Sequence, residues 1–279
     1  MQTGSPSRTA LRVAHRRAAH QLLDQPPVLA DPIAISILGN DFALDRNKEA
    51  HRIARSFRAF MAARSRYAED NLAVAVSAGV QQFVVLGAGL DTFAWRNPFP
   101  SLRVFEVDFP ATQAWKRDLL RAANLPEPAS LTFVPLDFEH QTLAAGLTQA
   151  GLDFHQPTFF SWLGVVPYLT LPAFRSTLDF IAALPAGSGL SFDFALSDAE
   201  LSPLLQLARK ALADRVAAAG EPFRLFFRSE QLENELRSAG FSQTEQLDSV
   251  DLNERYFHQR ADGLSLPPAG LGKLATAWV

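Results

Sequence analysis

The sequence predicts an α/β protein with a Rossmann-like, doubly wound sheet of seven strands and an N-terminal helical cap. Three observations predict this fold. Apolar runs of strand length alternate with helical segments between residues 83 and 194, which is typical of a parallel sheet with right-handed crossovers. The first run, residues 83–86, leads directly into the turn Gly87-Ala88-Gly89. Two extended segments near the C-terminus could add a closing hairpin to five parallel strands.

Three helical segments precede the first strand. Residues 8–23 carry apolar side chains at helical spacing, and Pro26-Pro27 ends that helix. A short helix begins at Asp31-Pro32, and a longer one covers residues 48–77. These helices are not part of a minimal doubly wound sheet. We therefore expect residues 1–79 to form a helical cap over the ligand edge of the sheet, and residues 80–279 to form the main domain.

The main domain reads as strands and helices in turn. The expected strands cover residues 83–86, 102–107, 131–135, 157–162 and 190–194, and the expected helices between them cover 110–124, 141–150 and 171–184. The last part departs from this alternation, with a helical segment at 199–219, a helix at 229–239 ended by Gly240, and candidate strands at 241–247 and 255–258. We interpret residues 197–228 as an inserted or lid segment.

Composition excludes several kinds of function. The formal net charge of −3 over 279 residues gives no reason to expect a nucleic-acid partner. The absence of cysteine excludes disulfides, thiolate zinc sites and a cysteine nucleophile. Histidines are scattered and no paired acids have metal-ligand spacing, so we expect no metal. No apolar run approaches the roughly twenty residues that cross a membrane, and the start does not resemble a secretory signal, so we expect a cytoplasmic protein.

The candidate binding residues follow the ends of successive strands. Gly87 and Gly89 lack Cβ atoms, so a nucleoside can lie against their backbone, although such a pair also suits a plain tight turn. About twenty residues later, Glu106 and Asp108 end the second strand, where a carboxylate can accept hydrogen bonds from ribose hydroxyls. The alternative for Asp108 is a cap on the helix that follows.

Two further strand ends complete the set. Asp137 and Phe138 follow the third strand, where they offer an acceptor and an aromatic wall for an adenine ring, although Asp137 could instead cap the next helix. The loop from Trp162 to Tyr168 follows the fourth strand. Because the carboxyl ends of parallel strands meet at one edge of a sheet, these residues predict an adenosine-ligand site there.

Four motifs carry a resemblance to a known family. LGAGLDTFAWR, FEVDFPATQAWKR, FVPLDFE and PTFFSWLGVVPYLT together resemble the leucine carboxyl methyltransferase-like family of class I S-adenosylmethionine-dependent methyltransferases, and a closing hairpin suits a methyltransferase sheet. The resemblance implies S-adenosyl-L-methionine as cofactor and S-adenosyl-L-homocysteine as product. It implies that Gly87 and Gly89 line the cofactor, that Asp108 binds its ribose, and that Asp137 and Phe138 bind its adenine.

The resemblance also concerns the methionine part of the cofactor. It implies that Arg64 binds the methionine carboxylate, for which a guanidinium is suited because it can donate two parallel hydrogen bonds. The alternative is an ion pair of Arg64 with Glu69 or another acid on the helix surface. Arg17 is a second candidate for the same role. The chain departs from the family at Leu163, where many relatives carry an acid, and this puts cofactor affinity in question.

We therefore expect an S-adenosylmethionine-dependent methyltransferase that methylates an oxygen, carboxylate or hydroxyl, of a small molecule. Methyl transfer from a sulfonium can rest largely on alignment, so no catalytic residue is assigned. Tyr168 is a candidate for the acceptor pocket, whereas His140 and His155 read as surface residues. The alternatives are a catalytically degenerate adenosyl-ligand-binding protein of the same fold and a nicotinamide-dependent oxidoreductase. The latter is weakened because Thr92 replaces the third glycine of GxGxxG.

Overall fold

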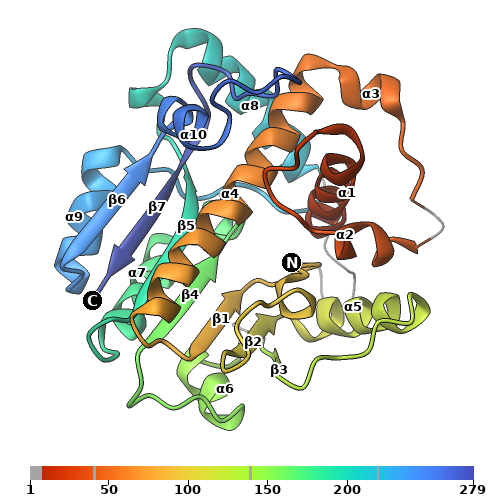
Figure 1. Cartoon of the computed structure of the whole chain (residues 1–279). Helices are drawn as coiled ribbons and strands as arrows, with labels where there is room; N and C mark the ends of the chain where they lie inside the picture. Colours follow the sequence, from red (N-terminus) through yellow and green to blue (C-terminus); the bar gives the residue numbers. More distant parts are fainter. Residues whose placement is uncertain (1–7, 40–41, 138–139, 219) are drawn as a thin grey trace.

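The computed structural model describes residues 8–39, 42–137, 140–218 and 220–279. These residues form one seven-stranded sheet in the order β3-β2-β1-β4-β5-β7-β6 (Figure 1). The first five strands in sequence pair in parallel, and β7 runs antiparallel to both β5 and β6. The strands are β1 Gln82–Leu86, β2 Arg103–Asp108, β3 Leu131–Pro135, β4 Thr158–Trp162, β5 Gly189–Ala195, β6 Gln243–Leu247 and β7 Gly272–Trp278.

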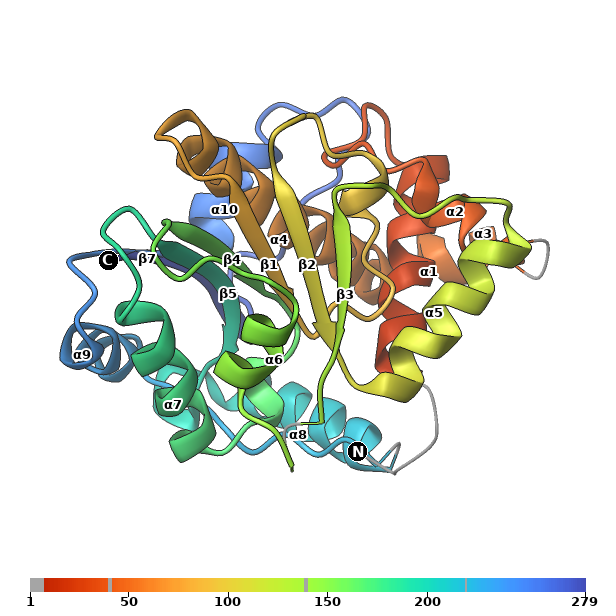
Figure 2. The same ribbon diagram turned by 90° about the horizontal axis from the view of Figure 1, so that it is seen from below.

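Helices cover both faces of this sheet (Figure 2). Alternate residues of β1 show the two faces: Val84 and Leu86 pack with α6, α7 and α9, whereas Phe83 and Val85 pack with α4. This alternation follows from the period of two in a strand, and it explains why the central strands read as unbroken apolar runs. The helices are α1 Arg8–Leu23, α2 Ile33–Ser36, α3 Arg46–Ala50, α4 Arg52–Ser77, α5 Pro110–Ala122, α6 Leu143–Gln149, α7 Leu171–Ala182, α8 Pro203–Ala217, α9 Ser229–Ala239 and α10 Ser249–Tyr256.

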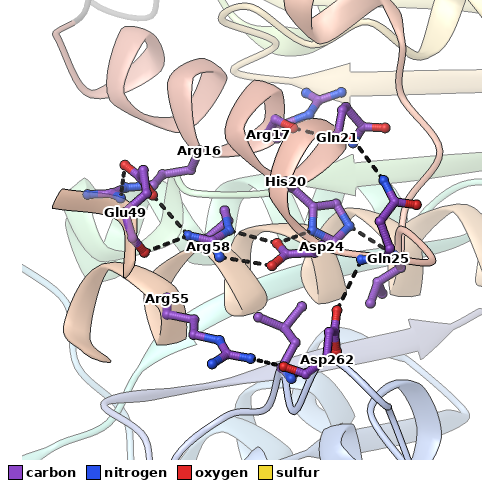
Figure 3. A network of polar contacts seen from close by, with 12 residues as sticks. Arg16, Arg17, His20, Gln21, Asp24, Gln25, Glu49, Arg55, Arg58 and Asp262 are labelled. Carbon is purple, nitrogen blue, oxygen red and sulfur yellow. Dashed lines mark hydrogen bonds and ion pairs between the residues drawn. The ribbon is translucent and has the colours of Figure 1, made fainter. Parts of the chain in front are cut away.

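A buried network of charges joins the helices that precede β1 (Figure 3). The guanidinium of Arg58, on α4, donates two hydrogen bonds to Asp24, at 2.7 and 2.8 Å, and a third to Glu49, at 3.0 Å. His20 Nε2 accepts the backbone N–H of Val28, so its Nδ1 carries the proton that is donated to Asp24. Because Arg58, Asp24 and His20 are all buried, the network fixes α1 and the turn after it against α4.

The long helix α4 is part of the sheet's own helical layer. Its C-terminal half contributes Leu72 and Ala75 to the apolar cluster around Phe83, and Tyr67 packs in the cluster that includes α10 and β7. Figure 1 shows α4 lying across the sheet in front of β4 and β5. The sequence predicted that the helices before β1 form a cap over the ligand edge, and the structure shows in addition that α4 covers one face of the sheet. A domain boundary at residue 79 and a separate cap remain a prediction.

Several predicted elements differ from the structure. The predicted strand at 255–258 is wrong: Asp248 and Asp251 form a capping box, so residues 249–256 are the helix α10, and the last strand is β7. The predicted helix 48–77 is interrupted at His51, whose backbone is extended with φ −61° and ψ 136°. The helix at 199–219 is shorter, with one 3₁₀ turn at Asp198–Glu200 followed by α8.

Candidate functional site: the carboxyl edge of the parallel strands

The turn after β1 requires glycine twice. Gly87 and Gly89 have φ angles of +66° and +48°, which side-chain-bearing residues rarely adopt. A Cβ atom on Gly87 would lie 2.4 Å from Cγ2 of Val165, and one on Gly89 would lie 3.1 Å from Cβ of Ala10. The loop after β4 and the start of α1 therefore approach the backbone of this turn directly, from residues far apart in sequence.

Asp108 connects the end of β2 to the glycine turn. Its Oδ2 accepts the backbone N–H of Gly89 at 2.5 Å, and its Oδ1 accepts that of Phe109 at 2.6 Å. Burial raises the pKa of this carboxyl group, and the two N–H donors oppose that rise. Phe109 is the N-cap residue of α5 and no side chain caps that helix. Helix capping therefore does not explain Asp108, whose carboxylate lies beside the glycines at the ligand edge.

Glu106, two residues earlier, has a different environment. It forms a buried ion pair with Lys116, a residue of α5. Burial raises the pKa of Glu106 to about 7, although the nearby Lys116 lowers it. The two acids at the end of β2 thus have different partners: the carboxylate of Glu106 binds Lys116 and joins α5 to the sheet, whereas the carboxylate of Asp108 binds the glycine turn.

Asp137 lies just past β3 and is partly exposed. Its backbone carbonyl accepts the N–H groups of His140 and Gln141, at 3.0 and 2.8 Å. The cap of α6 is Thr142, whose side chain accepts the N–H of Ala145, so Asp137 is not the N-cap of that helix. Phe138, the other residue expected to contact adenine, lies outside the described residues. An adenine-binding role for both residues remains a prediction.

Arg64 projects from α4 toward the loop after β4. The side chain is buried, and its Nη1 lies 3.2 Å from Oδ2 of Asp193, on β5. A Cβ atom on Gly164 would lie 3.0 Å from the same Nη1. Within the described residues, Nε of Arg64 has no hydrogen-bond partner. The predicted alternative partner Glu69 instead binds Arg96, at 2.8 Å. Arg64 is therefore at the carboxyl edge of the sheet, near the loop after β4.

Asp193 is a residue of this edge that the sequence analysis missed. Its Oδ1 accepts the backbone N–H of Gly164 at 2.5 Å while Oδ2 faces Arg64. The β4–β5 register ends at the pair Trp162–Phe192, and Leu163 and Asp193 are the residues that follow these two. The signal in the sequence was an acid within the apolar strand LSFDF, since a buried carboxylate requires compensating partners.

Tyr168 brings three segments together beside this edge. It ends the 3₁₀ turn Val166–Tyr168, and its ring lies against Phe223 with centroids 5.2 Å apart. Burial raises the pKa of Tyr168 to about 12, with smaller effects from a hydrogen bond to Thr9 and from the charges of Glu221, Arg64 and Asp193. Thr9 also donates to Glu221. The start of α1 and the segment after α8 therefore meet at Tyr168.

The segment expected to be a lid leaves the sheet and returns to the same place. Leu196 and Phe227 form a parallel bridge, and Ser197 N donates to the carbonyl of Phe227 at 2.9 Å. Beyond α8, the backbone N–H groups of Arg224 and Leu225 donate to the carbonyl of Pro167, at 2.7 and 3.2 Å. The chain thus leaves the sheet after Leu196 and returns beside it at Phe227, and the last residues before Phe227 contact the loop after β4. That it opens and closes as a lid remains a prediction.

The hydrogen bonds of Arg17 are to residues other than Asp193, which is the partner of Arg64. It is buried and binds Asp31, Thr92 Oγ1 at 2.7 Å, and Asp91 at 3.2 Å. Four polar groups from the cap and from the loop after the glycine turn thus meet at one place. Both Nη groups of Arg17 have protein partners, whereas its Nε, like that of Arg64, has none within the described residues. A role of Arg17 toward the methionine carboxylate therefore remains a prediction.

Over residues 8–39, 42–137, 140–218 and 220–279 there is no group of three or more His, Cys, Asp or Glu side chains placed to hold a metal ion. Over the same ranges, none of the helices has both the length and the apolar character needed to cross a membrane.

Comparisons with known proteins identify the family. The family model of leucine carboxyl methyltransferase matches residues 10–182. A Bacillus subtilis protein assigned as an S-adenosyl-L-methionine-dependent methyltransferase is 32% identical over 95% of this chain and 96% of its own length. A Mycobacterium avium protein with the same assignment is 31% identical over 77% of this chain and 73% of its own.

Solved structures show the same fold at low sequence identity. A Thermobifida fusca structure described as a methyltransferase has a TM-score of 0.58 and 17% identity, and the match covers 99% of this chain and 96% of that one. A Streptomyces avermitilis structure has a TM-score of 0.53 and 18% identity, with 94% and 96% covered. The family match and the similarity to the Bacillus subtilis protein identify S-adenosyl-L-methionine as the cofactor. The chain belongs to the leucine carboxyl methyltransferase family of S-adenosyl-L-methionine-dependent methyltransferases.

Proposed function

We propose that this protein transfers a methyl group from S-adenosyl-L-methionine to an oxygen atom of a small molecule. The residues at the carboxyl edge suit the cofactor. Gly87 and Gly89 form a tight turn with positive φ directly after β1, Asp108 is an acceptor beside them, and Arg64 has a buried Nε without a partner among the described residues. These are the groups that a ribose and an amino-acid carboxylate require.

Each of these residues has remaining capacity for a ligand. Each oxygen of Asp108 accepts one backbone N–H and so retains acceptor capacity for ribose hydroxyls. Arg64 is in contact with Asp193 through Nη1, which leaves the rest of its guanidinium to bind a carboxylate. We extend the proposal to Asp137 and Phe138 for adenine. When bound, the cofactor supplies an electrophilic methyl group that needs only a correctly aligned nucleophile.

The observation that favours an oxygen acceptor is the position of Tyr168 beside the carboxyl edge. Its phenol, whose pKa is raised by burial, is protonated near pH 7 and can donate a hydrogen bond to an acceptor oxygen. The charged groups that influence it are Glu221, Arg64 and Asp193. A carboxylate is already ionised at pH 7, so it needs no base, and the Tyr168 hydroxyl can hold one of its oxygens.

A small acceptor also suits the cover over this edge. Thr9 donates to Glu221, and the backbone N–H groups of Arg224 and Leu225 donate to the carbonyl of Pro167. The start of α1 and the segment after α8 therefore cover the loop that carries Tyr168, which favours a small acceptor over a large one. We propose no nucleic-acid partner and no membrane contact. We also propose that the protein acts in the cytoplasm.

The experiment is methyl transfer from cofactor carrying a radiolabelled methyl group, with panels of small carboxylic acids and hydroxy compounds as acceptors. Methyl esters release volatile labelled methanol in mild base, whereas methyl ethers do not. Base-labile label supports the carboxylate, base-stable label on a hydroxyl supports the other oxygen, and label on nitrogen or carbon contradicts the proposal. Cofactor binding with no transfer to any panel member would favour the catalytically degenerate alternative.

A further inference from the structure

Asp193 is a buried acid in a strand that is otherwise built for packing. Its neighbours Phe192 and Phe194 are 0% and 2% exposed, and Asp193 itself is 8% exposed. Because side chains alternate along a strand, the two rings point into the core under α7, and Asp193 points to the other face, where it meets Arg64 of α4. The acid therefore lies between the sheet and α4, beside the carboxyl edge.

The Arg64–Asp193 pair is incompletely bonded. One nitrogen of the guanidinium contacts one oxygen, at 3.2 Å, rather than making the two parallel hydrogen bonds of a strong arginine–carboxylate pair. Nε of Arg64 has no partner within the described residues. Oδ1 of Asp193 accepts only the N–H of Gly164 among the hydrogen bonds of the described chain. A buried pair formed only for stability would gain from saturating these groups, since desolvation of both charges is costly.

A cation and an anion side by side match a zwitterion. The methionine part of S-adenosyl-L-methionine carries a carboxylate and an ammonium group on one carbon atom, and both are charged near neutral pH. A guanidinium with a free Nε can take the carboxylate, and a carboxylate with free lone pairs can take the ammonium. The pair lies against the loop after β4, because Arg64 Nη1 would be 3.0 Å from a Cβ atom on Gly164. The next residue of this loop, Val165, lies close to the glycine turn, because its Cγ2 would be 2.4 Å from a Cβ atom on Gly87.

We propose that Asp193 binds the ammonium group of the cofactor's methionine while Arg64 binds its carboxylate. This inference rests on cofactor binding at the edge proposed above. The same assignment supplies the acid that position 163 lacks, since Asp193 accepts the backbone N–H of Gly164, the residue after Leu163. Asp193 is thus a cofactor-binding residue supplied by the neighbouring strand.

The test is calorimetric titration of the full chain with four ligands. S-adenosyl-L-homocysteine carries both charged groups, its deaminated analogue lacks the ammonium, its decarboxylated analogue lacks the carboxylate, and 5′-methylthioadenosine lacks both. Asp193→Asn keeps the shape and removes the charge. We expect it to weaken the two ligands that keep the ammonium by tenfold or more, since a charge-assisted hydrogen bond is lost, and to leave the other two within about twofold. Arg64→Gln should instead weaken the two ligands that keep the carboxylate.

Three outcomes separate the inference from the proposal on which it rests. Equal weakening of all four ligands by Asp193→Asn would overturn the inference and indicate a structural ion pair. If Asp193→Asn does not fold, the wild-type chain decides, because equal affinity for S-adenosyl-L-homocysteine and its deaminated analogue would also overturn it. Absence of binding of every adenosyl ligand to the wild type would contradict the cofactor site itself.

Discussion

Replacing Gly87 with alanine tests how closely the loop after β4 covers the glycine turn. At φ +66° any L side chain costs about 1–2 kcal/mol. The new Cβ would also lie 2.4 Å from Cγ2 of Val165, and overpacking of this kind costs about 1–3 kcal/mol. We therefore expect Gly87→Ala to lower the free energy of unfolding by about 2–5 kcal/mol, which most domains survive.

Chemical denaturation of two comparison variants separates the two contributions. Gly39 has the same φ of +66° as Gly87, and no atom of the described residues lies within 4 Å of the position that its Cβ would take, so Gly39→Ala should show backbone strain alone. In a double-mutant cycle, Val165→Ala removes the colliding methyl group and should recover part of the loss caused by Gly87→Ala. If Gly87→Ala is no less stable than Gly39→Ala, and Val165→Ala recovers nothing, the close approach described for this turn is wrong.

Three further predictions concern other parts of the molecule. Asp24→Ala leaves the buried Arg58 charge without its main partner and should lower the free energy of unfolding by about 3–5 kcal/mol. Asp214→Ala, which breaks the exposed pair with Lys210, should lower it by less than about 1 kcal/mol, and similar losses in the two variants would refute the role of the network. Burial raises the pKa of Glu106 to about 7, so its contribution to the free energy of unfolding is complete below the unfolded pKa and is lost as the pH rises toward 7. Glu106→Gln should lack this loss of stability with rising pH, and parallel stability–pH profiles of the variant and the wild type would contradict the prediction. Tyr168→Phe should lower kcat/KM for methyl transfer by about two- to tenfold without changing the affinity for S-adenosyl-L-homocysteine, and an equal loss of both would exclude an acceptor-binding role.

Local sequence patterns predicted the parts of the fold that local forces determine. Buried parallel strands read as apolar runs, so β1, β3 and the strand ends at Gly87 and Asp108 could be located from residue types alone. The predicted helix 229–239 matches α9, and Gly240 ends it with φ +111°. These features depend on a few neighbouring residues.

Features that depend on tertiary partners could not be predicted in this way. Arg64 and Glu69 are five residues apart and do not share a helix face, and Glu69 finds Arg96 from the loop after the glycine turn. Asp193 becomes informative only once the fold brings it to Gly164 and Arg64. The error at residues 255–258 has a local cause, since Asp248 and Asp251 are three residues apart and this spacing of a capping box favours a helix from residue 249.

The most direct test of the cofactor site is titration of S-adenosyl-L-homocysteine into the wild type, Asp108→Asn and Glu106→Gln. The two acids are two residues apart at the end of β2, but Asp108 faces the glycine turn and Glu106 is paired with Lys116. Micromolar binding that falls at least tenfold in Asp108→Asn, and stays within about threefold in Glu106→Gln, is the predicted result. Unchanged affinity in Asp108→Asn would contradict the placement of the ribose at the end of β2.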